Sequence, residues 1–118
     1  MKHLLVVAHG SRRAASNDEV RELVYQMRRH NQNYDRIECA FLELAEPSIP
    51  DGIQNCIDSG AEEVIVLPYF LAAGTHVVND IPELIQEKQQ EHPDVSIRQA
   101  GHVGALPGMI DLMLKAAD

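Results

Sequence analysis

LLVVAHGSRR, residues 4–13, is the stretch that decides the fold. Five apolar residues in a row are typical of a strand buried on both faces of a parallel sheet. The abrupt change to polar residues after Ala8 predicts that this strand ends at His9. Because open α/β sheets bind ligands beyond the carboxyl ends of their strands, His9 is a candidate functional residue.

The rest of the chain alternates between strand and helix patterns. We expect strands at residues 4–8, 36–42, 63–67 and 95–99, each followed by an amphipathic helix. Three pairs have the spacing of helix N-terminal caps: Ser16 with Glu19, Ser48 with Asp51 and Asp80 with Glu83. A last helix is expected after Pro107.

The resulting βαβαβαβα order predicts a parallel sheet with right-handed crossovers and helices on both faces. The continuously apolar strands at 4–8 and 63–67 belong in the centre and the other two outside. The four-stranded order 2-1-3-4 follows, which is the flavodoxin-like order without its last strand. Since no linker or repeat is present, we expect one α/β domain over residues 1–118.

Charge and composition exclude several classes of partner. The net charge of −8 argues against non-specific binding to nucleic acid or to an anionic membrane. The N-terminal apolar run is too short for a signal peptide, and no stretch approaches the roughly 20 apolar residues of a membrane span. We therefore expect a cytoplasmic protein without a nucleic-acid or membrane partner.

The cysteines and several histidines carry no functional pattern. Cys39 and Cys56 form no CxxC pair or disulfide framework, so we expect two small, buried thiols. His3, His30 and His92 do not follow a strand end and are expected at the surface.

Three loops that follow strands each carry a possible metal ligand. His9 follows the first strand, Glu43 the second and His76 the third, and all three should converge at one edge of the sheet. Two imidazoles and a carboxylate suit Co²⁺, Ni²⁺, Fe²⁺ or Zn²⁺ and leave coordination positions open for exchange. Taken singly, His9 also fits a turn-forming or capping role, Glu43 a solvated loop carboxylate, and His76 an ordinary loop histidine.

Two further groups lie near the same edge. Ser11, Arg12 and Arg13 stand at the amino end of the first helix, where free N–H groups and the helix dipole favour anions. They are candidates to bind a substrate carboxylate or phosphate, or alternatively form a solvated first turn. His102 follows the fourth strand and is expected on the rim rather than as a metal ligand.

Three segments resemble the signatures of one enzyme family. They are HGSR at 9–12, FLELAEPSI at 41–49, and VLPYFL at 66–71 followed by GTHV at 74–77 and DIP at 80–82. In order and spacing they closely resemble the sirohydrochlorin cobaltochelatases, in the short single-domain form of the class II tetrapyrrole chelatases. The loop at 101–107 matches this family less well.

This resemblance implies a chelatase-like fold and the insertion of Co²⁺ into sirohydrochlorin on the way to cobalamin. Related enzymes insert Fe²⁺ to form sirohaem or Ni²⁺ to form a nickel tetrapyrrole. His9 and His76 would then bind the metal and take part in removing pyrrole protons, with Glu43 as a further metal contact. No organic cofactor is expected, and a single-domain chain is expected to form a homodimer.

The tetrapyrrole would be held by groups around these ligands. Its carboxylates should be repelled by a protein of charge −8, so a local basic patch of Arg12 and Arg13 is expected. The residues expected to contact the substrate are Ser11, Arg12, Arg13, Gly74 and Thr75.

Two other functions compete with this interpretation. Phosphohistidine-forming phosphatases and mutases also contain a His-Gly turn followed by Arg, but they have Arg before the histidine, where this chain has Ala8. A non-enzymatic carrier or store for Co²⁺ or Ni²⁺ would use similar ligands, although the chain lacks the Cys/His-rich tract that such proteins often use.

Overall fold

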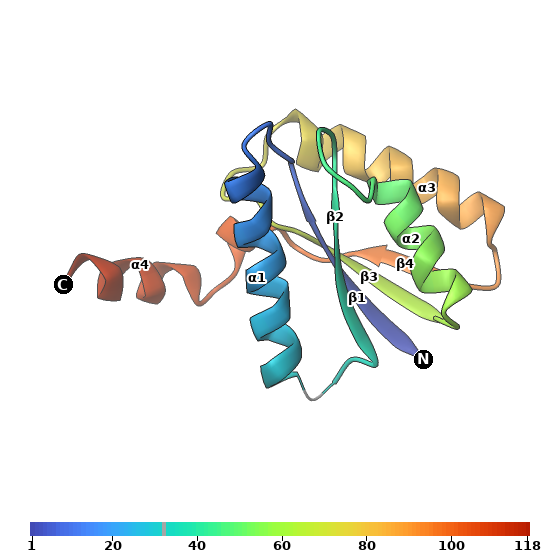
Figure 1. Cartoon of the computed structure of the whole chain (residues 1–118), viewed down its shortest axis with the longest axis horizontal. Coiled ribbons are helices and arrows are strands. Elements are labelled where there is room, and N and C mark those ends of the chain that lie inside the picture. The colour runs from blue at the N-terminus through green and yellow to red at the C-terminus, as the bar shows by residue number, and fades with distance from the viewer. Residues whose placement is uncertain (32) are drawn as a thin grey trace.

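The computed structural model describes residues 1–31 and 33–118. Four parallel strands, β1 (Lys2–Ala8), β2 (Arg36–Phe41), β3 (Glu63–Pro68) and β4 (Ser96–Gln99), form one sheet in the order β2-β1-β3-β4 (Figure 1). The predicted α/β fold and strand order are therefore confirmed. The helices are α1 (Ala14–His30), α2 (Ile49–Asp58), α3 (Ile81–Glu91) and α4 (Met109–Ala117), with a π-helical turn η1 (His76–Asp80) and a 3₁₀ turn η2 (Val103–Ala105).

The first strand lies in the middle of the sheet, as its apolar run predicts. Val6 pairs with Cys39 of β2 on one side and with Leu67 of β3 on the other. Every residue from His3 to Ala8 is buried. His9 therefore leaves the sheet between the ends of β2 and β3.

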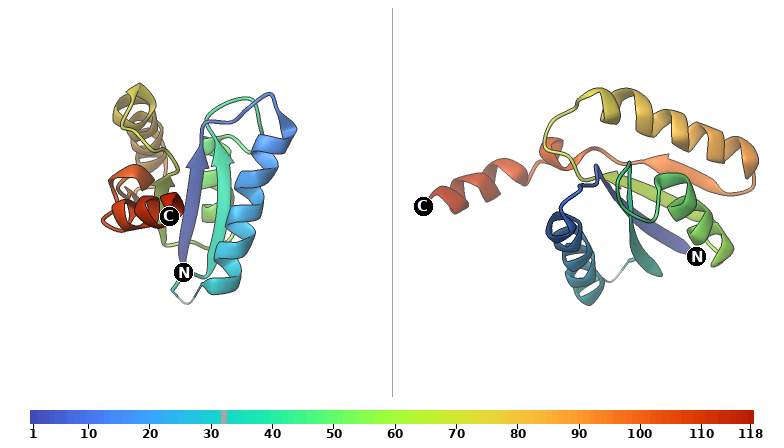
Figure 2. Two further views of the ribbon diagram at one scale, coloured as in Figure 1. Left: turned by 90° about the vertical axis from the view of Figure 1, so that its left-hand side faces the viewer. Right: turned by 45° about the horizontal axis from the view of Figure 1, so that its top comes forward.

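Helices cover the two faces of the sheet unequally. On one face, Val24 of α1 packs in a cluster with Leu4, Val6, Ile37 and Ile65. On the other, Ile53 of α2 and Ile81 of α3 are buried against the opposite side of the same strands. The two further views show α1 on one side of the sheet and α3 on the other (Figure 2). α4 packs on neither face and extends away from the body of the molecule (Figure 1).

The cap patterns predict the starts of α2 and α3 correctly and the start of α1 wrongly. The Ser48 hydroxyl accepts a hydrogen bond from the Asp51 backbone N–H at 3.2 Å, so the predicted start of α2 is confirmed. The predicted cap of Ser16 with Glu19 is wrong, because α1 already begins at Ala14 and its N-terminal flanking residue, Arg13, has no side-chain cap. The predicted start of α3 at Asp80 is confirmed, since Asp80 directly precedes its first residue, but the Asp80 side chain makes no cap hydrogen bond, because the backbone is already helical from His76 onwards.

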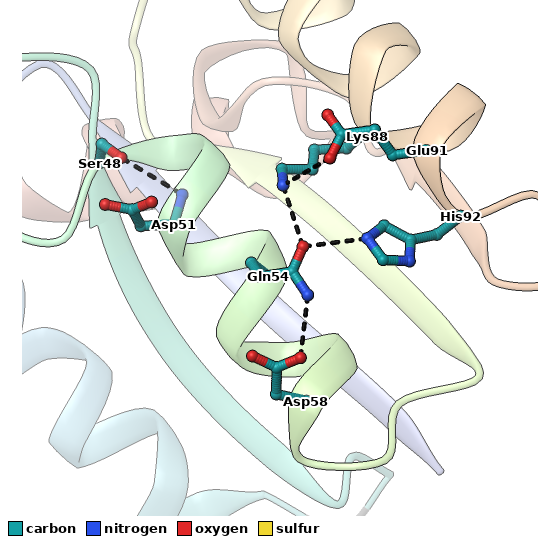
Figure 3. Close-up of polar contacts among 7 residues, drawn as sticks. All are labelled: Ser48, Asp51, Gln54, Asp58, Lys88, Glu91 and His92. Carbon is teal, nitrogen blue, oxygen red and sulfur yellow. Dashed lines mark hydrogen bonds and ion pairs between the residues drawn. The ribbon is translucent and has the colours of Figure 1, made fainter.

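A polar network joins α2 to α3 (Figure 3). The Gln54 carbonyl oxygen accepts a hydrogen bond from Lys88 Nζ at 3.0 Å and lies 3.0 Å from His92 Nε2, while the Gln54 amide donates to Asp58 at 2.9 Å. His92 is thus half-buried and bonded between the two helices, so its predicted surface position is wrong. His30 is exposed, as predicted.

The predicted surface position of His3 is also wrong. Its side chain is 0% exposed, and neither ring nitrogen has a hydrogen-bond partner among residues 1–31 and 33–118. Burial lowers the pKa of this imidazole, and the nearby Arg36 lowers it further. A cavity of about 270 Å³ adjoins His3 at the amino end of the sheet.

The two cysteines are free thiols within the fold. Cys56 is buried and Cys39 is half-buried. Burial raises the pKa of both thiols, that of Cys56 to about 11, so both stay protonated near neutral pH. Within the described residues, no helix is both long enough and apolar enough to cross a membrane.

Candidate functional site

The structure brings His9, Glu43 and His76 together at the carboxyl edge of the sheet. His9 Nε2 lies 3.4 Å from Glu43 Oε1, and the rings of His9 and His76 meet edge to face with their centroids 5.0 Å apart. The three side chains are 44%, 56% and 43% exposed, in that order. The convergence predicted from three separate loops is therefore present, in a position open to solvent and to a large ligand.

Gly10 allows the first two loops to approach one another. Its φ is +91°, a conformation that disfavours any residue with a Cβ, and a Cβ there would overlap the carbonyl oxygen of Glu43. The backbone pairing of β1 with β2 continues into the loops that follow them, because the Glu43 N–H donates to the His9 carbonyl at 3.0 Å. The HG pair thus sets the position of Glu43 beside His9.

A contact from α1 holds the other end of the Glu43 loop. The Arg21 guanidinium lies over the Phe41 ring at 5.1 Å and donates a hydrogen bond to the Glu46 carbonyl at 3.2 Å. Leu44, between these anchors, has a φ of +65°, which is uncommon for a residue with a branched side chain. The loop is therefore constrained on both sides of Glu43.

The hydrogen bonds of His9 define which nitrogen is available. His9 Nδ1 lies 3.0 Å from the Gly10 carbonyl oxygen, which can only accept, so Nδ1 carries the hydrogen. Nε2 then presents either a proton or a lone pair to the Glu43 carboxylate. A lone pair facing a carboxylate is unfavourable unless a cation lies between them, so this pair favours the binding of a proton or a metal ion.

His76 is oriented in the same way by a residue that sequence reasoning assigned to another role. His76 Nδ1 lies 2.7 Å from Asp80 Oδ2, so it donates to the carboxylate and leaves Nε2 for a metal ion. Both residues belong to the π-helical turn η1, and such turns occur often at functional sites. The spacing of four residues between His76 and Asp80 is the signal that could have identified this pair.

The three candidate ligands, His9, Glu43 and His76, are close but are not arranged around one point. In residues 1–31 and 33–118, no three His, Cys, Asp or Glu side chains form a ready-made metal cage. His9 contacts Glu43 through Nε2 and His76 through an edge-to-face ring contact.

The structure gives Ser11 a local role and leaves the two arginines exposed. The Ser11 hydroxyl accepts from the Arg13 N–H at 3.0 Å, while its N–H and carbonyl bond to the side chain of Asn17 at 2.9 and 2.8 Å. Asn17 is 7% exposed and was not identified from the sequence, where it resembles any polar helix residue. Arg12 and Arg13 are exposed at the amino end of α1, whose first turn has no acidic residue.

The remaining candidates border the site without a defined contact. Gly74 and Thr75 are exposed directly before His76, and a Cβ at Gly74 would meet no atom within 4 Å. The loop that contains His102 lies beside the loop after β3, because the Gly104 N–H donates to the Phe70 carbonyl at 3.0 Å. This position agrees with the expectation that His102 lies near the rim.

Large apolar side chains are exposed in the same loops. Leu44 follows Glu43, Tyr69 and Leu71 follow β3, and Val78 lies two residues after His76. Leu71 is 71% exposed. We call Leu44, Tyr69, Leu71 and Val78 the apolar rim. Exposed apolar side chains beside polar ligands are typical of a binding surface.

The chain is similar to a known protein family and to several curated proteins. A family model described as CbiX matches residues 3–118. The chain is 36% identical over 110 residues to a chloroplastic sirohydrochlorin ferrochelatase of Arabidopsis thaliana, covering 93% of this chain and 48% of that protein. It is 42% identical over 85 residues to a sirohydrochlorin cobaltochelatase of Methanococcus maripaludis, covering 72% of this chain and 58% of that protein.

A solved structure matches the chain over nearly its whole length. It is a cobalamin (vitamin B12) biosynthesis CbiX protein from Marinobacter aquaeolei VT8, with a TM-score of 0.82 and 31% sequence identity. The match covers 99% of this chain and 93% of that one. By contrast, this chain spans only about half the length of the two curated relatives.

Proposed function

This chain belongs to the CbiX family, and we propose that it inserts a divalent metal ion into sirohydrochlorin. The observation that carries the proposal is the pair of oriented imidazoles. His9 and His76 each donate from Nδ1, to the Gly10 carbonyl and to Asp80, so both keep Nε2 for a metal ion beside Glu43. The chelatase names of the relatives supply the substrate class.

The proposed mechanism exchanges one metal ion for two protons. Two pyrrole N–H protons must leave as the ion enters the macrocycle. An imidazole that releases the metal regains a lone pair at Nε2, and imidazole is a suitable proton acceptor near neutral pH. His9 and His76 can therefore take one proton each, and Asp80 would stabilise the imidazolium that forms at His76.

The surroundings of the site suit a flat, carboxylate-bearing macrocycle. The apolar rim offers side chains against which the ring can pack, and its members are 41% to 71% exposed. Arg12 and Arg13 are free to meet carboxylates at the positive end of the α1 dipole. Gly74 and Thr75 would line the approach to His76.

We propose Co²⁺ as the metal, with Fe²⁺ and Ni²⁺ as the ions to compare. Imidazole and carboxylate ligands bind all three, and affinity alone does not decide which ion a protein uses in the cell. Matching relatives include both a cobaltochelatase and a ferrochelatase, and these names support a common chemistry with different ions.

We also propose that a second copy of the chain completes the site, and that the protein acts in the cytoplasm. One copy of the chain would contact a bound macrocycle on one of its two faces only. The Arabidopsis thaliana relative is about twice as long as this chain, because the 110 matched residues are 48% of it, which leaves room in it for a second unit of the same size. A homodimer would supply that unit here.

An anaerobic absorption assay tests the proposal. Purified protein is mixed with sirohydrochlorin and Co²⁺, beside a no-protein control, because cobalt also enters the macrocycle spontaneously. We expect the wild type to accelerate insertion, and the His76→Ala variant to fall to the control rate. Repetition with Fe²⁺ and Ni²⁺ ranks the metals. A wild type no faster than the control with any ion would contradict catalysis and leave a metal carrier as the better explanation.

A further inference from the structure

Asn17, the fourth residue of α1, is buried although its side chain is polar. It is 7% exposed, and its amide reaches back six residues to the loop before the helix. There Oδ1 accepts a hydrogen bond from the Ser11 N–H at 2.9 Å, and Nδ2 donates to the Ser11 carbonyl at 2.8 Å. Both ends of the amide are therefore bonded to a single loop residue, with little competition from water.

These two contacts fix the direction of the Asn17 amide. A backbone carbonyl can only accept and a backbone N–H can only donate, so Nδ2 faces the Ser11 carbonyl and Oδ1 faces the Ser11 N–H. A reversed amide would place oxygen against oxygen at one contact and N–H against N–H at the other. Asn17 thus presents an acceptor to the Ser11 N–H in one fixed direction.

The Ser11 N–H belongs to the same peptide group as the Gly10 carbonyl, which is the acceptor of His9 Nδ1 at 3.0 Å. A trans peptide group is planar, and its N–H and C=O point in opposite directions. Asn17 therefore holds one end of this plane, and the imidazole of His9 is bonded to the other end. One rigid peptide group connects the buried amide to the candidate metal ligand.

A rotation of this peptide group would change the His9 ring. Residue 10 is a glycine, so no Cβ resists a half-turn of the peptide group that follows it. The half-turn would point the Ser11 N–H at His9 Nδ1, which would then accept, and the hydrogen of the neutral ring would lie on Nε2. Nε2 would keep no lone pair for a metal ion. The direction of this peptide group thus decides whether His9 is able to act as a ligand.

The other hydrogen bonds of the loop leave this peptide group free to turn. The Ser11 hydroxyl accepts from the Arg13 N–H, and the Glu43 N–H donates to the His9 carbonyl. Neither bond involves the Gly10 carbonyl or the Ser11 N–H. Among residues 1–31 and 33–118, Asn17 is the one partner of the Ser11 N–H.

We propose that Asn17 is the positioning residue of His9: it holds the Gly10–Ser11 peptide group and thereby keeps the lone pair of His9 Nε2 available to a metal ion. Asp80 orients His76 by direct contact at 2.7 Å, so each imidazole has an orienting residue of its own. Loss of such a partner typically lowers metal affinity 10- to 100-fold. This inference rests on the metal binding proposed above and adds the residue that prepares one of the ligands.

The ring-nitrogen spectrum of the metal-free chain tests the proposal. Long-range ¹H–¹⁵N nuclear magnetic resonance at pH 8, where a free imidazole is neutral, reports which nitrogen carries hydrogen. We expect Nδ1 of His9 in the wild type and Nε2 in most molecules of Asn17→Ala. Asn17→Asp still accepts from the Ser11 N–H and should keep the hydrogen on Nδ1. Since both variants lose the bond to the Ser11 carbonyl, their comparison isolates the contact that holds the peptide group.

Calorimetric titration with Zn²⁺ measures the consequence for metal binding. We expect about 10-fold lower affinity in Asn17→Ala, and affinity within about two-fold of the wild type in Asn17→Asp. The exposed Asn79→Ala serves as control and should also stay within about two-fold. Far-UV circular dichroism and urea unfolding measure separately how much each change destabilises the fold.

Three outcomes would overturn the proposal. Hydrogen on Nδ1 of His9 in Asn17→Ala would do so alone, and so would hydrogen on Nε2 in Asn17→Asp, a result that decides even if the alanine variant does not fold. Hydrogen on Nε2 in the wild type would overturn this proposal together with the orientation of His9 described above. Since neither measurement contains a tetrapyrrole, the results do not depend on whether the protein inserts metal.

Discussion

Two histidines at opposite ends of β1 have opposite environments. His3, at the amino end, is fully buried, and neither ring nitrogen has a hydrogen-bond partner in the part of the chain that the structure describes. His9, just past the carboxyl end, is 44% exposed, with Nδ1 next to a carbonyl and Nε2 facing a carboxylate. Histidine is thus part of the buried core at one end of the strand and a candidate metal ligand at the other.

The difference lies in what surrounds each ring. Burial alone withdraws His3 from solvent and lowers its pKa, which favours an inert, neutral ring. At the other end, loops rather than strands surround the ring, and they supply Gly10, Glu43 and His76. The candidate metal ligands therefore lie at the carboxyl edge, whereas the opposite end of β1 holds a buried ring outside the candidate site. The following predictions test this division.

The largest expected effect is on metal insertion by the His9→Ala variant. Because His9 is the proposed metal ligand and proton acceptor, its removal should lower the insertion rate by about 10³-fold, within the range for a lost general base. His3→Leu is the matched change at the other end of β1 and should leave the rate within about two-fold of wild type. The anaerobic absorption assay measures both rates. Equal losses in the two variants would contradict the division between the ends.

Gly10→Ala should destabilise the protein and disturb the site together. The new Cβ would meet the Glu43 carbonyl oxygen at a backbone position with positive φ, so we expect a loss of about 3 kcal/mol in the free energy of unfolding. Gly101→Ala is the control, because a Cβ there meets no atom within 4 Å. Urea unfolding gives both values. A Gly10→Ala variant as stable as the control would show that the two loops do not require this contact.

Asp80→Asn should weaken metal binding without unfolding the chain. The neutral amide orients the His76 ring less strongly than the carboxylate, and loss of such a partner typically costs 10- to 100-fold in metal affinity, so we expect about 10-fold. Calorimetric titration with Co²⁺ measures the affinity, and the neighbouring exposed Asn79→Ala serves as control. An unchanged affinity would limit Asp80 to a structural role in η1.

His3→Leu should stabilise the protein. Two buried ring nitrogens without partners each carry a desolvation cost, and leucine removes both while filling a similar volume. We expect a gain of about 1 kcal/mol in the free energy of unfolding, measured with urea near neutral pH. His30→Leu, at an exposed position, should change it by less than about 0.5 kcal/mol. A destabilised His3→Leu variant would indicate that the imidazole has a partner in solution.

The same histidine should make stability depend on pH. Since burial lowers the pKa of His3 in the folded chain, the unfolded chain takes up this proton first, below about pH 6.5. The free energy of unfolding should therefore decrease as the pH falls through this range, and less so in the His3→Leu variant. Urea unfolding of both proteins at pH 7.5 and 5.5 measures the difference. Parallel pH curves would remove His3 as the cause.

The features that follow from the strand order, namely the sheet topology and the meeting of three loops at one edge, are predicted correctly from the sequence. The apolar runs at 4–8 and 63–67 set the central strands, and the ends of parallel strands necessarily meet at one edge. The convergence of His9, Glu43 and His76 follows from these two facts alone. Ser48 was identified as a cap because its bond to Asp51 spans only three residues.

Features that depend on tertiary packing were missed. His3 precedes the apolar run, but β1 already begins at Lys2, and position 3 shares the buried face with Leu5 and Val7. Asp80 has the spacing of a cap with Glu83, whereas the π-helical turn directs its carboxylate to His76. The amphipathic pattern of α4 predicts a helix but cannot say which molecule covers it.

The most direct test of the account is the ring-nitrogen spectrum of the histidines during a metal titration. Long-range ¹H–¹⁵N nuclear magnetic resonance distinguishes Nδ1 from Nε2 and reports which one carries hydrogen. We predict that His9 and His76 are protonated at Nδ1, and that Zn²⁺, as a diamagnetic substitute, shifts Nε2 of both rings while His3 and His30 stay unchanged. Binding of the ion through Nδ1, or at His3 instead of the carboxyl edge, would contradict the account.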